Sequence, residues 1–79
     1  MAESRFFAHV DAEGRHRAHP VQAENALEAA VVFAETWLPH DGEHGEVRVI
    51  VEDCETGVAQ CYLVDLTELD AEPCPPAAS

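Results

Sequence analysis

The stretch "EVRVIVEDCETGVAQCYLV", residues 46–64, predicts a β-hairpin and decides the fold class. Apolar and polar side chains alternate over residues 46–52, which is the period of a strand with one buried face. "DCETG" then supplies a turn in which Gly57 can take a left-handed conformation, and residues 58–64 return as the second strand. A four-residue loop pairs side chains across one face of this hairpin: Val47 with Val64, Val49 with Tyr62, and Val51 with Gln60.

The segment before this hairpin predicts an amphipathic helix over residues 26–38. Asn25 is a favourable N-cap and Glu28 follows three residues later, which is the spacing of a capping box. Pro39 ends the helix. Residues at helical spacing predict the buried stripe, flanked by Phe33: Leu27, Ala30, Val31, Ala34, Trp37 and Leu38.

The N-terminal segment predicts a second hairpin, in which "RFFAHV" and "RHRAH" are joined by the turn "DAEG". Pairing of Asp11 with Arg15 across that turn sets the register: Val10 opposite His16, His9 opposite Arg17, Ala8 opposite Ala18, and Phe7 opposite His19. The fold class is therefore α+β, a ββαββ arrangement with a four-stranded antiparallel sheet and one helix packed on one face, in two layers. We assign residues 1–66 to this single domain and residues 67–79 to an acidic, then Pro-rich, disordered C-terminal tail.

The stretch "DGEHGEVRVIVEDCETGVAQCYLV", residues 41–64, resembles a family of small bacterial ββαββ domains of unknown function. The Asp-Gly pair at 41–42 and the hairpin turn with Asp53 and Thr56-Gly57 carry the resemblance, which covers about residues 5–66. These are turn residues, so the resemblance implies a fold and no activity.

The sheet face without a helix is the candidate contact surface. It mixes apolar and charged side chains, as interface patches do, although monomers also tolerate scattered exposed apolar residues. From the expected registers, and together with Val21, this face presents Arg5, Phe7, His9, Arg17, His19, Arg48, Ile50, Cys61 and Leu63. The cations Arg5 and Arg17, with His9 and His19, could alternatively bind an anion.

Charge and cysteine content limit the function classes. The net charge of −12, with 16 acidic residues against 4 basic ones, repels phosphate backbones and anionic lipid headgroups, so we expect no direct nucleic-acid or membrane binding. The chain has three cysteines, no CxxC motif and no cysteine pair brought together by the expected registers, which favours a reducing compartment. No signal peptide is evident. The expected location is the cytoplasm.

Chemistry-bearing motifs are weak in this chain. The loop "HDGEH" could fold around a metal ion, with His40, Asp41, Glu43 and His44 as the candidate ligands. A polar connection after the helix explains the same residues equally well, so no metal site is assigned. Neither catalytic residues nor a cofactor is predicted, and we do not expect an enzyme. The expected function is a non-catalytic protein-interaction module, as a homodimer or with a protein partner. The alternatives are an acidic decoy or inhibitor of a basic nucleic-acid-binding protein, and a weak metal- or anion-binding protein.

Overall fold

The structure is a computed structural model that describes residues 3–38 and 45–75. In these residues the chain forms one α-helix, a one-turn 3-10 helix and five strands. Their bounds are β1 Ser4–Val10, η1 Arg15–Arg17, β2 His19–Ala23, α1 Ala26–Trp37, β3 Glu46–Asp53, β4 Ala59–Asp65 and β5 Asp70–Pro73. The expected α+β class is confirmed.

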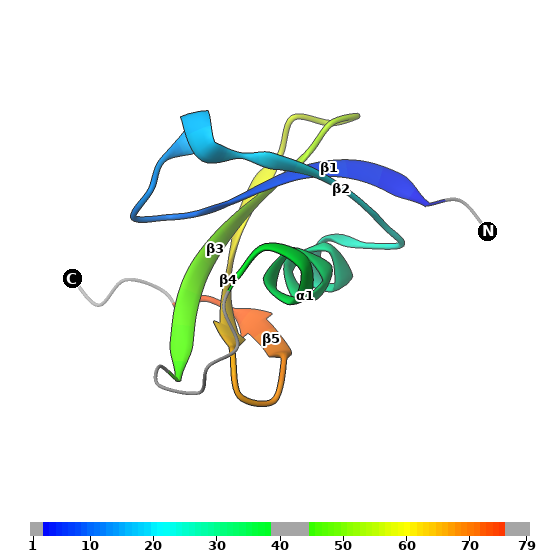
Figure 1. Cartoon of the computed structure of the whole chain (residues 1–79). Helices are drawn as coiled ribbons and strands as arrows, with labels where there is room; N and C mark the ends of the chain where they lie inside the picture. The colour runs from blue at the N-terminus through cyan, green and yellow to red at the C-terminus, as the bar shows by residue number, and fades with distance from the viewer. Residues whose placement is uncertain (1–2, 39–44, 76–79) are drawn as a thin grey trace.

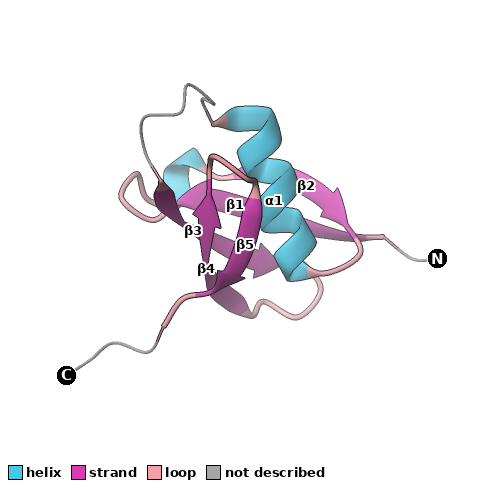
Figure 2. Ribbon diagram, turned by 90° about the horizontal axis from the view of Figure 1, so that it is seen from below, coloured by secondary structure: helices cyan, strands magenta, loops and turns pink. Residues whose placement is uncertain are grey.

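The strands form one antiparallel sheet in the order β2-β1-β3-β4-β5. The sheet curves around α1, with β1 and β2 on one side of the helix and β5 on the other (Figure 1). Seen from below, the helix crosses the strands and covers only one side of the sheet (Figure 2). The molecule therefore has two layers, and the sheet has a concave face under the helix and a convex face without one.

The expected count of four strands is wrong, because β5 adds a fifth at the β4 edge. The composition of this segment predicts a disordered tail, but Ala71 pairs with Val64 and packs against the core, and this burial holds the segment in the sheet. Pro73 lacks a backbone N–H, yet an edge strand tolerates proline since one side of it needs no partner. A four-residue strand with proline at its end has too short a pattern to be distinguished from a loop.

The β3–β4 hairpin has the predicted register, which is confirmed at all three pairs named above. Its turn is fixed by local chemistry. Asp53 Oδ1 accepts a hydrogen bond from the Glu55 N–H at 2.7 Å, and the Asp53 carbonyl accepts one from the Gly57 N–H at 2.8 Å. Gly57 has a φ of 76°, which residues with a side chain rarely adopt.

The predicted register of the first hairpin is wrong by one residue. Ala8 pairs with His19 and Phe6 with Val21, and η1 lies in the longer connection between β1 and β2. The observed pairing turns Val21 and Ala23 toward the helix, where both are buried. The predicted register would have left Val21 on the convex face. Because a shift of one residue exchanges the two faces of a strand, burial of these side chains selects the register.

The helix begins where predicted. The Glu28 N–H donates to Asn25 Oδ1 at 2.8 Å, so Asn25 is the N-cap. The buried stripe is rotated from the predicted one: Ala29, Ala30, Phe33 and Ala34 face the sheet, whereas Leu27 and Trp37 are 40% and 48% exposed. Alanines bring the helix close to the sheet, and the large side chains at its two ends lie at the margins of this contact.

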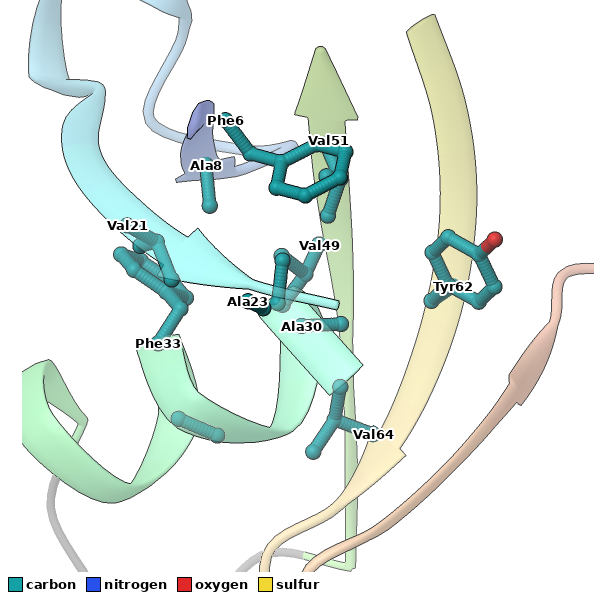
Figure 3. Packing of buried hydrophobic residues seen from close by; sticks show 12 residues of the cluster. Phe6, Ala8, Val21, Ala23, Ala30, Phe33, Val49, Val51, Tyr62 and Val64 are labelled. Atoms are coloured by element: carbon teal, nitrogen blue, oxygen red, sulfur yellow. The ribbon is translucent and has the colours of Figure 1, made fainter. Parts of the chain in front are cut away.

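The core lies between the helix and the concave face. Side chains from the helix and from β1 to β4 meet there (Figure 3). Phe33, Val49, Val51 and Val64 are the largest fully buried members. The alternate side chains of the same strands must point away from the helix, so the packing that forms the core also determines the composition of the convex face.

Candidate functional site

The convex face carries most of the predicted contact residues. Residues directly opposite each other on antiparallel strands point to the same side, and the registers place Phe7 beside Glu52, His9 beside Ile50, and Ile50 beside Cys61. By strand alternation the predicted residues that lie on this face are Arg5, Phe7, His9, Arg48, Ile50, Cys61 and Leu63.

Apolar side chains occupy the middle of the convex face. Phe7 is 40% exposed, and Ile50 and Leu63 are partly buried. His9 is only 8% exposed, although no helix covers it. The burial is local, because Phe7 on the same face of β1 is much more exposed. The face thus offers one prominent aromatic ring and shallow apolar surface around it.

The connection between β1 and β2 is tied to the convex face by an ion pair. The Arg15 Nη2 atom lies 3.0 Å from Glu52 Oε1, and Glu52 belongs to the convex side of β3. Arg15 is highly exposed, so this pair contributes little stability. The Arg15 guanidinium offsets the negative charge of the Glu52 carboxylate, which lies beside Phe7.

Charge is distributed unevenly along the convex face. Arg5 lies at one end and, in the described residues, neither Arg5 nor Arg48 forms an ion pair. The opposite end carries carboxylates, because β3, β4 and β5 pair there. These side chains are Glu46, Asp65, Asp70 and Glu72. Arg48 lies beside Leu63, next to this acidic end.

The expected placement of His19 and Arg17 on the convex face is wrong. His19 pairs with Ala8 and therefore points to the helix side, where its ring stacks on Trp37 at a centroid distance of 4.0 Å and an angle of 11°. Arg17 belongs to η1 and is exposed, outside the paired strands. The one-residue register shift causes both differences. It places Arg17 and His19 away from Arg5 and His9, so the four side chains expected to bind an anion do not share one face.

A disulfide bond joins Cys61 to Cys74 with a Cα–Cα distance of 5.4 Å. The expectation that no cysteine pair is brought together is wrong, because β5 leads the chain to Cys74 beside Cys61, where the Cys74 N–H donates to the Cys61 carbonyl at 3.0 Å. Recognising β5 in the sequence would have been the signal for this bridge. Cys54 is an exposed free thiol.

The expected loop candidates His40, Asp41, Glu43 and His44 lie outside the described residues. Within residues 3–38 and 45–75, no group of three or more His, Cys, Asp or Glu side chains is arranged to hold a metal ion. Over the same residues, no helix has the length and apolar character needed to cross a membrane.

Comparison with known proteins identifies the family. No curated protein and no solved structure matches the chain significantly. One family model does match, and it covers residues 4–75, from the start of β1 to beyond β5. The match thus includes the fifth strand and the second cysteine of the disulfide. The chain belongs to this family, described as a family of unknown function (DUF5961).

Proposed function

We propose that this domain is a non-catalytic protein-interaction module whose convex face binds a second copy of the chain. The observation that carries the proposal is the uncovered sheet face with Phe7, on the strand beside the central strand β3, 40% exposed. Aromatic side chains are enriched in interfaces and often dominate their binding energy. Phe7 is large and preformed on a strand, so its ordering on binding costs little.

The charges on the convex face favour self-association. In a two-fold dimer the same patch is used by both copies, so the patch must complement itself. A two-fold axis in the interface plane and oblique to the strands exchanges the corner of the face that holds Arg5, on β1, with the acidic corner that holds Asp70, on β5. Each Arg5, which has no ion pair within the described residues, then gains a carboxylate partner.

The curvature of the sheet limits the strength of this contact. A stable interface buries about 800 Å² of each partner, which is about 15% of the 5216 Å² surface of this chain. Two convex faces meet over less area than two flat ones. We therefore expect a dimer that dissociates on dilution.

Analytical ultracentrifugation over a hundredfold concentration range tests the proposal. We expect the average mass to rise toward the dimer in the wild type and to stay at the monomer value in Phe7→Ser. Val58→Ser is the matched control, since Val58 is 53% exposed but lies in the turn region outside the convex face, and it should dimerise normally. A wild type that is monomeric throughout, or equal weakening by both variants, overturns the proposal.

A charge exchange tests the orientation of the dimer. Arg5→Glu should weaken association by placing like charges together, and the double variant Arg5→Glu with Asp70→Arg should restore it. Failure of the double variant to recover association would exclude the arrangement in which these two ends meet.

We retain the cytoplasmic location of this module as a proposal that needs its own test. The Cys61–Cys74 bridge argues in the other direction, since disulfides persist mainly in oxidising compartments. Measuring the redox state of Cys61 and Cys74 by thiol labelling of the protein in intact cells decides between the two: a persistent bridge excludes a reducing compartment.

A further inference from the structure

A groove of about 760 Å³ opens at the end of the molecule where α1 begins. It lies between the start of the helix, the start of β1 and the turn that joins β3 to β4. Its strand residues, such as Phe6 and Tyr62, belong to the concave side of the sheet. The groove is therefore separate from the convex face and independent of the proposed dimer.

The groove has an aromatic floor and apolar shoulders. Phe6 and Tyr62 are buried. Leu27 and Val58, at the sides of the groove, are 40% and 53% exposed. The Tyr62 hydroxyl donates a hydrogen bond to Gln60 Oε1, and burial raises the pKa of this phenol, so it is neutral at physiological pH. The rings of the floor are therefore neutral, and only a small part of each is exposed.

The charge lining the groove is entirely negative. Glu24 and Asp53 are the ionisable carboxylates, and none of the described residues that line it is Lys, Arg or His. Asp53 Oδ1 accepts N–H groups from the turn, at Glu55 and Thr56, which fixes the carboxylate without neutralising it. A cation is therefore favoured electrostatically, and an anion is opposed.

We propose that this groove binds a small organic cation, in which an ammonium or guanidinium group is carried on an apolar or aromatic body. The body would contact Phe6, Tyr62 and the two exposed apolar side chains, and the cationic group would lie near Glu24 and Asp53. The volume is within the range of small-molecule sites, and aromatic rings with nearby carboxylates attract organic cations. The start of α1 would favour an anion instead, but Asn25 already accepts the Glu28 N–H there, and the lining carboxylates oppose negative ligands.

Three probes of nearly equal size and different charge test the proposal: phenethylamine, 2-phenylethanol and phenylacetate. Titration of the full chain, followed by two-dimensional ¹H–¹⁵N NMR, reports both affinity and location. We expect phenethylamine to bind about tenfold more tightly than the alcohol, which corresponds to about 1.4 kcal/mol, and phenylacetate to bind most weakly. The shifted amides should be those of the groove, around Leu27 and Val58. Equal binding of all three probes, or preference for phenylacetate, overturns the proposal.

Charge-neutral variants locate the attraction. Glu24→Gln and Asp53→Asn should each weaken phenethylamine binding severalfold and leave 2-phenylethanol binding unchanged. Asn at position 53 retains an oxygen that can accept the turn N–H groups, so the fold is kept. Glu35→Gln is the matched control, because it removes the same charge from an exposed helix position that does not line the groove. If Glu35→Gln weakens binding equally, the attraction comes from net charge alone and the groove is not a site.

Discussion

The disulfide between Cys61 and Cys74 is expected to provide a large share of the stability of this domain. The bridge closes a loop between residues 13 apart in sequence. For a loop of this length, the restriction of the unfolded chain corresponds to about 3 kcal/mol at 25 °C. A small domain has a total stability of about 5–15 kcal/mol. Without the bridge, β5 is held by its pairing with β4 and by the packing of Ala71.

The measurement is urea denaturation followed by the fluorescence of Trp37, the single tryptophan of the chain. The double variant Cys61→Ser with Cys74→Ser should lose about 3 kcal/mol in free energy of unfolding relative to the wild type. Cys54→Ser is the matched control, because it removes an exposed free thiol and leaves the bridge intact, and it should change the free energy of unfolding little. Hydrogen exchange on reduction should accelerate first at the Cys74 amide, which donates to the Cys61 carbonyl.

Two results would refute this reasoning. A loss below about 1 kcal/mol in the double variant would mean that the bridge restricts the unfolded chain little or that the native geometry opposes it. Unchanged exchange at the Cys74 amide after reduction would show that strand pairing and packing alone hold β5 in place.

Three further outcomes follow from the structure. Because burial raises the pKa of Tyr62, the unfolded chain loses the phenol proton at lower pH than the folded chain does. The free energy of unfolding should therefore fall as the pH rises above 10.0. Urea denaturation at increasing alkaline pH checks this, and Tyr62→Phe should remove that part of the pH dependence. Gly57→Ala should cost about 1 kcal/mol in thermal or urea unfolding because of the positive φ, whereas Gly45→Ala, which has open space and no positive φ, should cost nothing; equal effects would contradict the backbone explanation. His19→Ala should expose Trp37 and shift its fluorescence to longer wavelength, with a loss of about 0.5–1.5 kcal/mol from the stacked pair; an unchanged spectrum would mean that the rings do not stack in solution.

The candidate site was predictable where it rests on the second hairpin. Alternation alone predicts which residues of this hairpin lie on the convex face, and the observed register confirms it for Arg48, Ile50, Cys61 and Leu63. The predicted position of His19 is wrong because a tight turn in the first hairpin does not allow Val21 to be buried, whereas the observed register does. The groove at the start of α1 could not be predicted, since its lining comes from segments that only the folded chain brings together.

Features that depend on neighbouring residues could be predicted from the sequence. The β3–β4 register follows from a period of two and from turn contacts within residues 53–57, and the helix start follows from the Asn25 side chain and an N–H three residues away. Such interactions act between residues close in the chain, so they can form without the rest of the domain.

The buried side of each element and the formation of β5 depend on contacts between segments that are distant in the chain. The helix turns its small alanines to the sheet and leaves Trp37 at the edge, and the first hairpin shifts to bury Val21. Residues 70–73 become a strand because β4 offers an edge and Cys61 a partner for Cys74. Each of these features depends on apolar burial or on a covalent bond between distant segments. Such interactions stabilise the chain only when the segments have been brought together in the folded domain.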